Sequence, residues 1–213
     1  MPIVYGTPLS PFVRKVMVAL AEKAIPYDFE VIMPINPTPE YKKISPLGKV
    51  PAFRDGERTL CDSSVIIAYL EKTKADPPLY PTDAYDYARA LWFEEFGDGG
   101  LSRIVGPKIF RPTIMAKITK QQADVAAIGK VVAEELPPLF DYLEGELGGK
   151  DWLVGSRFSI ADIGVATQFV NLQLAGYGVD AKRWPKLSTY VSRAHVRPSF
   201  SDAIGKAKAA IPG

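Results

Sequence analysis

A serine flanked by prolines is the first feature of this sequence that could carry chemistry. Ser10 follows a strand-like segment, Ile3–Tyr5, and precedes a helical pattern that starts at Phe12. At the positive end of a helix, a serine hydroxyl can donate a hydrogen bond to a thiolate, and the helix dipole stabilises the same charge. A serine before a proline can also be simply an N-cap or a turn residue. Because serine has no sulfur, this junction cannot exchange disulfides.

Two further motifs lie downstream of this serine. Val50-Pro51 opens a predicted β-hairpin, and proline is tolerated as the first residue of a strand. Asp62-Ser63 stands where the second strand of the hairpin meets the next helix. The N-terminus of a helix binds anions through its free amide groups, although either residue could be only the N-cap. The three motifs together predict a site at strand and helix ends.

Other catalytic arrangements are absent from the sequence. There is no G-x-S-x-G motif, and His195 is the only histidine. Gly97–Gly100 lacks the third glycine of a dinucleotide-binding fingerprint, and Gly149-Lys150 is followed by an aspartate, unlike a P-loop. The one cysteine, Cys61, excludes an internal disulfide and a cysteine-rich metal site. It ends a predicted strand, where we expect it to be buried filler.

Bulk composition is that of an ordinary globular protein. The chain has 213 residues, 47% of them apolar, and a formal net charge of +2. This balance gives no indication of nucleic acid or an anionic membrane as the main partner. No basic segment precedes an apolar one at the N-terminus, and no apolar run approaches the roughly 20 residues of a membrane span. We therefore expect a cytoplasmic protein without membrane or nucleic-acid partners.

Strand and helix patterns alternate over residues 1–75. Apolar residues at helical spacing predict a helix from Phe12 to Ala24, and an alternating pattern predicts a strand over Tyr27–Val31. Asp55-Gly56 predicts the turn of a hairpin. A helix is expected over Ser63–Lys72. The order βαβ, connecting segment, ββα is similar to the thioredoxin-like arrangement.

The remainder of the chain carries helical patterns. Residues 76–84 are a proline-rich linker, and residues 85–213 are expected to form an all-helical domain. Glycines at 97, 99 and 100 are expected to bend or end its first helix, and Pro137-Pro138 to break another. Ser159 and Asp162 have the spacing of a capping box, with Phe158 and Ile163 at the positions of a hydrophobic staple.

These motifs resemble those of the cytosolic glutathione S-transferases, in particular serine-type, bacterial-like members. The resemblance covers nearly the whole chain and is strongest over residues 5–72 and 152–200. It rests on Ser10, Val50-Pro51, Asp62-Ser63, the Ser159-x-x-Asp162 motif and the C-terminal pattern of residues 184–200. It implies a thioredoxin-like N-terminal domain (1–75) followed by a C-terminal helical bundle.

The resemblance also implies how glutathione would be bound. Lys49 would contact the glycine carboxylate, with a solvated lysine as the alternative. Pro51 would follow a cis bond that turns Val50 outward to pair with the cysteinyl part of glutathione. Asp62 and Ser63 would hold the ammonium and carboxylate of the γ-glutamyl group. The usual residue in the family is glutamate, and Asp62 is one methylene shorter.

Ser10 would be the catalytic residue, stabilising the thiolate of glutathione. A free thiol has a pKa of about 8.5 and is only slightly ionised at neutral pH, so a transferase must lower that pKa. Tyr5 is an alternative, because other members use a tyrosine near the end of the first strand, although we expect it to pack. Thr7 is a further hydroxyl. Arg14 is expected to be a domain-bridging or surface charge.

The electrophile site is expected to be formed by the loop around Pro8-Leu9, the segment Pro34–Pro39 and the first helix of the second domain. Such helical aromatic residues are more often core than substrate pocket. The candidates are Leu9, Trp92, Phe96, Phe110 and Arg111.

The predicted function is that of a glutathione transferase with glutathione as co-substrate, no metal, and a small hydrophobic electrophile. A glutathione-dependent isomerase or dehalogenase would share the activation step. A non-catalytic interaction protein on the same fold is the alternative from another class. A homodimer is expected from the resemblance.

Overall fold

The computed structural model describes residues 1–211, which form two compact units. The first contains Met1–Leu79 together with Pro198–Ala207, and the second contains Tyr80–Arg197 with the described residues that follow 207. The last ten residues of the first unit lie within the range that we expected in the helical domain, 85–213. They belong to helix α11 (Pro198–Ala209), whose Ser199 hydroxyl donates to the carboxylate of Glu22.

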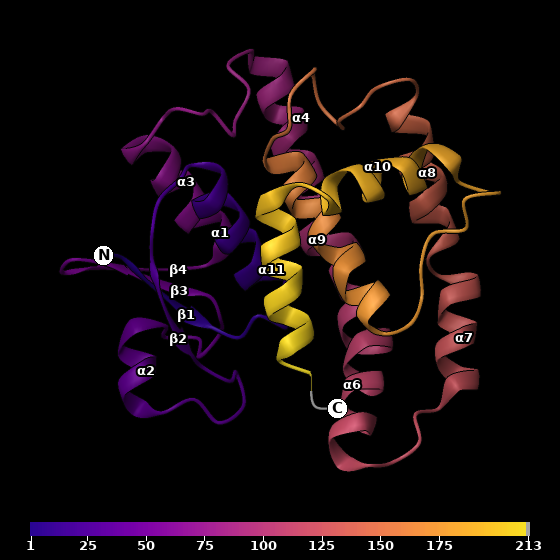
Figure 1. Cartoon of the computed structure of the whole chain (residues 1–213), viewed down its shortest axis with the longest axis horizontal. Coiled ribbons are helices and arrows are strands. Elements are labelled where there is room, and N and C mark those ends of the chain that lie inside the picture. Colours follow the sequence, from indigo (N-terminus) through magenta and orange to yellow (C-terminus); the bar gives the residue numbers. More distant parts are fainter. Residues whose placement is uncertain (212–213) are drawn as a thin grey trace. The chain divides into compact units, whose positions relative to one another are not determined.

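The first unit is built on a four-stranded sheet in the order β2-β1-β3-β4. Strand β1 pairs parallel with β2 and antiparallel with β3, and β3 pairs antiparallel with β4. Figure 1 shows α1 and α3 on one side of this sheet and α2 on the other. The thioredoxin-like arrangement is therefore confirmed. Its elements are β1 Ile3–Gly6, α1 Pro11–Glu22, β2 Asp28–Val31, α2 Pro39–Ile44, β3 Ala52–Asp55, β4 Arg58–Cys61 and α3 Ser63–Thr73.

Helix α1 lies in the core of the first unit because its apolar residues recur at helical spacing. Val13, Val16 and Leu20 are fully buried. Its other end is fixed by the buried Lys23, whose ammonium lies 2.6 Å from a carboxylate oxygen of Glu71. The same ammonium donates to two backbone carbonyls, at residues 74 and 77. A buried cation with this many partners is fully compensated, so α1 and the chain after α3 are held in one arrangement.

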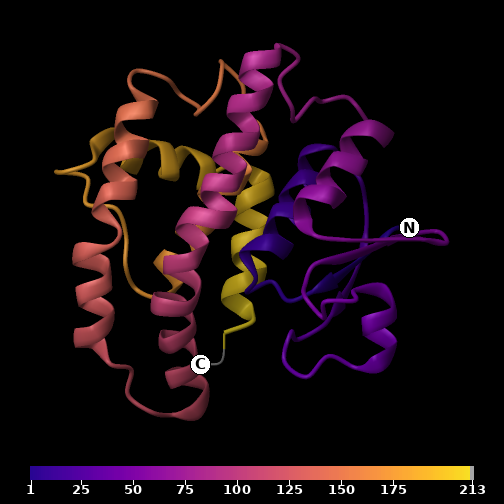
Figure 2. The ribbon, with the colours of Figure 1, turned by 180° about the vertical axis from the view of Figure 1, so that it is seen from behind.

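The second unit is helical throughout. Figure 2 shows α4 passing through η1, α5 and η2 into α6 as one nearly continuous helical rod. The glycines at 97, 99 and 100 do not end this helix, as one of our alternatives expected, but lie in the π-helical segment η1. The elements are α4 Ala84–Glu95, η1 Phe96–Leu101, α5 Ser102–Ile104, η2 Val105–Phe110, α6 Arg111–Thr119, α7 Val125–Glu134, α8 Pro137–Leu147, α9 Ile160–Leu174 and α10 Pro185–His195.

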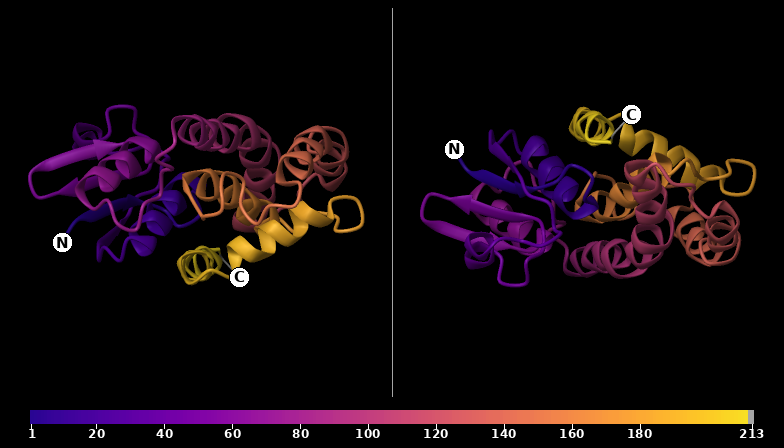
Figure 3. Two further views of the ribbon diagram at one scale, coloured as in Figure 1. Left: turned by 90° about the horizontal axis from the view of Figure 1, so that it is seen from above. Right: turned by 90° about the horizontal axis from the view of Figure 1, so that it is seen from below.

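Helix α9 forms the core of the second unit, between α4 and α10 (Figure 3). It starts at the predicted capping box, where the carboxylate of Asp162 accepts from the Ser159 amide at 2.9 Å and from the Leu153 amide at 3.0 Å. Burial raises the pKa of the Asp162 carboxyl to about 6, against the effect of these hydrogen bonds. Gly97 lies where η1 crosses α9, since a Cβ there would be 2.3 Å from the carbonyl oxygen of Gly164. No helix of the described residues has the length and apolar character required to cross a membrane.

Candidate active site

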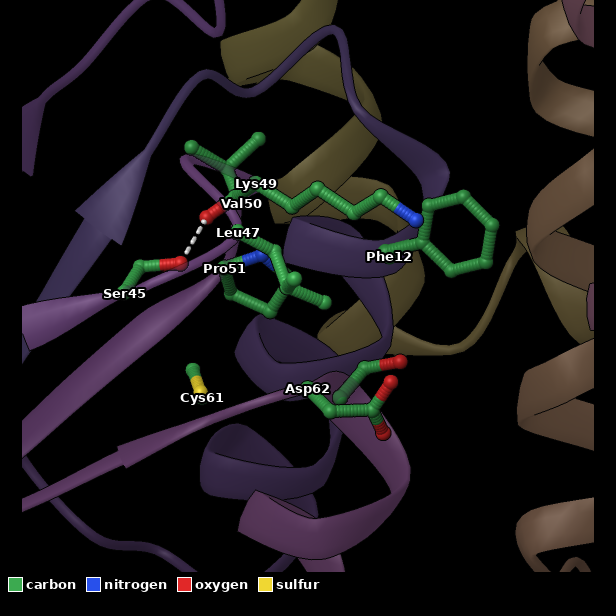
Figure 4. A pocket seen from close by; sticks show the side chains of 9 residues that line it. Phe12, Ser45, Leu47, Lys49, Val50, Pro51, Cys61 and Asp62 are labelled. Atoms are coloured by element: carbon green, nitrogen blue, oxygen red, sulfur yellow. Dashed lines mark hydrogen bonds between the residues drawn. The ribbon is translucent and has the colours of Figure 1, made fainter. Parts of the chain in front are cut away.

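A cavity of about 200 Å³ opens in the first unit, at the ends of β3 and β4 and the start of α3. Figure 4 shows Lys49 along one side of the cavity and Asp62 on the other. The cavity is lined by residues from α1, from the segment between α2 and β3, and from the β4–α3 junction. These residues are Phe12, Ser45, Leu47, Lys49, Val50, Pro51, Cys61, Asp62 and Ser63.

The segment before β3 is shaped by hydrogen bonds to one carbonyl group. The Lys49 carbonyl accepts from the hydroxyls of Tyr41 and Ser45, both at 2.8 Å. The next bond, Val50-Pro51, is cis, as the resemblance implied. Neither backbone group of Val50 forms a hydrogen bond with another residue in the described part of the chain. This edge of the cavity therefore presents a peptide unit that a peptide-like ligand can pair with.

Asp62 has two roles available to its carboxylate. One oxygen, Oδ1, accepts from the amides of Ser64 at 2.9 Å and Val65 at 3.4 Å, so it is the N-cap of α3. The other oxygen has no partner among the described residues and lies at the cavity. The backbone of Asp62 has φ 78° and ψ 131°, a conformation that a residue with a side chain rarely adopts. Such strain is typical of binding and catalytic sites, where the surrounding structure holds the residue in place.

Ser63 is the first residue of α3 and is only 2% exposed. Its side chain lines the cavity, yet its hydroxyl forms no hydrogen bond with any residue that the structure describes. The hydroxyl is therefore open to the cavity and available to a ligand or solvent molecule there. Asp62 already caps the amides of Ser64 and Val65. The hydroxyl donor of Ser63 and the positive end of the α3 dipole favour an anionic group here.

Lys49 supplies a positive charge at the cavity. Its side chain is exposed, and its ammonium forms no ion pair within residues 1–211. The cavity thus combines a cation, a carboxylate oxygen, a hydroxyl at a helix N-terminus and an unpaired peptide unit. This set suits a short peptide that carries both an ammonium and separated carboxylates.

Ser10 is the N-cap of α1. It precedes the lining residue Phe12 by two positions in the sequence but is not itself one of the lining residues. Its Oγ accepts from the Val13 amide at 3.4 Å, which leaves the hydroxyl proton free to be donated. From the same helix, Phe12 lines the cavity. Leu9 and Thr7 are not among the lining residues either, and the Thr7 hydroxyl accepts from the Leu9 amide.

Tyr5 is not one of the residues that line the cavity. It is 4% exposed and packs in a cluster with Tyr41 and Ala52. Burial raises the pKa of its hydroxyl, with a smaller contribution in the same direction from Glu30. A tyrosine that activates a thiol would need access to the ligand, so the structure favours the packing role that we expected.

Arg14 is not a surface charge. It is fully buried within α1, and its guanidinium donates to the Pro8 carbonyl at 3.1 Å. Burial lowers its pKa to about 9. This contact fixes the loop that leads into Ser10, so Arg14 acts on the junction through the backbone.

The predicted electrophile residues of the second unit lie on the helices α4, η1, η2 and α6. Trp92 is 47% exposed, and its indole nitrogen donates to the hydroxyl of Tyr142 at 2.7 Å. Phe96 packs on the same tyrosine, with ring centroids 5.1 Å apart. Phe110 is 9% exposed and Arg111 lies on the surface at the start of α6. Their roles toward an electrophile stay predictions.

Four lining residues were not among the predicted site residues. Phe12 and Leu47 are apolar side chains close to the Ser10 and Lys49 motifs, and that proximity was the available signal. Ser45 carried no signal of its own. Cys61, expected as buried filler, is partly exposed and lines the cavity. Among residues 1–211, no group of three or more histidine, cysteine, aspartate or glutamate side chains is arranged to hold a metal.

A thioredoxin-like unit, a helical unit and a cavity at the cis-proline edge define a class of two-domain proteins. Residues 4–78 match the family model of the glutathione S-transferase N-terminal domain, and residues 92–193 match that of the C-terminal domain. Glutathione S-transferase U4 of Arabidopsis thaliana is 30% identical over 190 residues, which cover 85% of this chain and 79% of that protein. The chain belongs to the glutathione S-transferase family.

Two bacterial proteins are similar over an even larger share of the chain. FtsZ-localized protein A of Caulobacter vibrioides is 25% identical, with 91% of this chain and 86% of that protein covered. The crystal structure of a glutathione S-transferase from Rhodospirillum rubrum superposes with a TM-score of 0.86 at 25% identity. The superposition covers 95% of this chain and 91% of the Rhodospirillum rubrum chain.

Proposed function

We propose that this protein is a serine-type glutathione transferase that binds glutathione in the cavity between Val50 and Ser63. The observation that carries the proposal is the hydroxyl of Ser63, a residue only 2% exposed, which opens into the cavity at a helix N-terminus without a partner in the described chain. Family membership supplies the class of ligand. Lys49 binds the glycine carboxylate, Val50 pairs with the cysteinyl backbone next to Pro51, and Asp62 and Ser63 hold the γ-glutamyl group.

Ser10 is the residue that we propose to activate the thiol. Its hydroxyl proton is free to be donated while its lone pair accepts from the Val13 amide. A hydrogen bond from this hydroxyl, together with the field of α1, favours the thiolate over the thiol. The thiolate then attacks a small hydrophobic electrophile, and the enzyme forms no covalent intermediate. Isomerisation or dehalogenation would use the same thiolate with another electrophile.

The test combines binding with turnover. We expect the wild-type protein to bind glutathione by calorimetry and to form conjugates with 1-chloro-2,4-dinitrobenzene, a general electrophile. Ser63→Ala should weaken glutathione binding, whereas Ser64→Ala, outside the cavity, should not. A protein that binds glutathione but turns over no substrate for conjugation, isomerisation or dehalogenation would contradict the enzymatic proposal. Absence of glutathione binding would contradict the assignment of the cavity.

A second candidate is a protein–protein interaction role on the same fold. It is favoured by the similarity to a protein whose name states that it is localised by FtsZ. Asp62 in place of the usual glutamate is consistent with a site that has changed its ligand. Recovery of one specific partner by crosslinking, in a protein that does not bind glutathione, would favour this candidate. A cytoplasmic homodimer remains part of the first proposal, and light scattering would test the dimer.

A further inference from the structure

A buried lysine joins α1 to the first turn of α3. Lys15 is 0% exposed, although it belongs to the same helix as Phe12, which lines the cavity. Its ammonium donates to the hydroxyl of Ser64 at 3.2 Å. Ser64 is the second residue of α3, and α1 and α3 lie on the same side of the sheet (Figure 1). A positive charge therefore lies inside the first unit, at the helix start that borders the cavity.

The residue that accepts from Lys15 is also bound to Asp62. The Ser64 amide donates to Oδ1 of Asp62 at 2.9 Å, so a single residue links the buried ammonium to this carboxylate. Asp62 and the adjacent Ser63 line the cavity, whereas Lys15 does not (Figure 4). Lys15 can therefore act on a ligand only through this turn or through its charge.

The γ-glutamyl end of glutathione carries an ammonium and a carboxylate on one carbon atom. In the proposed arrangement Asp62 receives the ammonium and Ser63 the carboxylate. A ligand carboxylate beside Ser63 is then close to the carboxylate of Asp62, and like charges repel more strongly where water is excluded. The positive end of α3 is equivalent to only about half an elementary charge. The buried ammonium of Lys15 adds a full positive charge at the same helix start.

We propose that Lys15 is a positioning residue of the glutathione site. Its ammonium offsets the charge of Asp62 and thereby lets Ser63 hold the α-carboxylate of the γ-glutamyl group. The proposal rests on the proposed function, because it assumes that this group lies at Asp62 and Ser63. Helix α1 then serves both ends of the ligand, with Ser10 at the thiol and Lys15 at the γ-glutamyl carboxylate.

The experiment measures the binding of two ligands to the full chain by calorimetry. One ligand is S-methylglutathione, whose thiol is blocked. The other is its analogue with a 4-aminobutanoyl group in place of the γ-glutamyl group, which keeps the amino group and lacks the α-carboxylate. Lys15→Met removes the charge and keeps a long apolar stem, whereas Lys15→Arg keeps the charge. Ser64→Ala is the matched control, because it removes the same hydrogen bond and leaves the ammonium in place.

The expected losses depend on the ligand carboxylate. Lys15→Met should raise the Kd for S-methylglutathione about tenfold and change the Kd for the analogue by less than about twofold. Lys15→Arg should bind S-methylglutathione more tightly than Lys15→Met, and Ser64→Ala should bind both ligands like the wild type. Because a buried charge is screened little by salt, the loss in Lys15→Met should persist at high salt, unlike that caused by substitution of the exposed Lys49.

The outcomes separate a role in binding from a role in packing. Equal losses for the two ligands in Lys15→Met would overturn the proposal, because Lys15 would then only hold α1 against α3. A loss in Ser64→Ala as large as that in Lys15→Met would overturn it for the same reason.

The wild type decides alone if circular dichroism shows that Lys15→Met does not fold. Its preference for S-methylglutathione over the analogue should persist at high salt. A preference that disappears would overturn the proposal, because an exposed charge would then hold the carboxylate. A wild type that binds neither ligand would overturn the proposed function and the role of Lys15 together, whereas the losses described above for the variants overturn only the role of Lys15.

Discussion

Asp62 offers a way to separate helix capping from ligand binding at a single carboxylate. Its Oδ1 caps α3 through the amides of Ser64 and Val65, while the other oxygen is available to a ligand ammonium. Asp62→Asn keeps an oxygen for the cap and replaces the free oxygen by an NH₂ group. Asparagine and aspartate have the same branching at Cγ, so the backbone conformation of this position, φ 78° and ψ 131°, makes the same demand on both. The substitution therefore changes the ligand contact and leaves the helix start in place.

The expected effect follows from these two roles. Asparagine and aspartate are nearly equal N-caps, so the free energy of unfolding should change by less than about 0.5 kcal/mol. A hydrogen bond to a charged group contributes about 1.5–3 kcal/mol, and exposure of this side chain reduces it to about 1–2 kcal/mol. The Kd for S-methylglutathione should then rise by about 5- to 30-fold.

The assay is calorimetric titration with S-methylglutathione and with an analogue that lacks the γ-glutamyl amino group. The wild type should bind the analogue as weakly as Asp62→Asn binds the complete ligand, and the variant should show no further loss with the analogue. Asp62→Ala serves as the control that also removes the cap. Equal binding of both ligands by wild type and Asp62→Asn would refute the reasoning, because Asp62 would then be only an N-cap.

Three further predictions follow from the charges and contacts of the structure. Burial raises the pKa of the Asp162 carboxyl from 3.8 to about 6. Between these pH values the folded state binds more protons than the unfolded state, so the stability that this group contributes is lost as the pH rises through 6. The difference in unfolding free energy between wild type and Asp162→Asn, from urea titrations, should therefore shrink by up to about 3 kcal/mol between pH 4 and pH 7, and an increase would contradict this sign. Gly97→Ala should lower stability by about 1–3 kcal/mol because a Cβ would be 2.3 Å from the Gly164 carbonyl oxygen, whereas Gly129→Ala, with no atom within 4 Å, should be neutral or stabilising in the same melts. Lys49→Gln should raise the Kd for glutathione about two- to fivefold at low salt and less at high salt, and a γ-glutamylcysteine control without the glycine should not distinguish the two proteins.

Much of the fold follows from local sequence patterns. The Asp55-Gly56 turn fixed the hairpin, and Ser159 with Asp162 marked the start of α9, because both are short-range signals with one dominant structure. The glycines of η1 do not predict a continuous helix, since glycine weakens an isolated helix. In the structure, Gly97 is required by the close crossing with Gly164, a contact that no local pattern shows.

The site was predictable in part. The Lys49, Val50-Pro51 and Asp62-Ser63 motifs could be placed at one cavity because strand and helix ends meet there. The exposure of Cys61 could not be predicted, because a residue at the end of a strand faces either the core or the edge according to register. Likewise, the sequence predicts Ser10 at the start of the helix. It does not show that Phe12, two residues later, lines the cavity.

The central claim is that Ser10 stabilises the thiolate of bound glutathione. The most direct measurement is a pH titration of the ultraviolet thiolate absorbance of glutathione bound to wild type, Ser10→Ala and Ser10→Thr. Threonine keeps both the cap and the hydroxyl donor, so it controls for loss of the helix cap in the alanine variant. The account predicts a thiol pKa well below the free value of about 8.5 in wild type and Ser10→Thr, and a value near the free one in Ser10→Ala. A lowered pKa that persists in Ser10→Ala, with glutathione still bound, would contradict it.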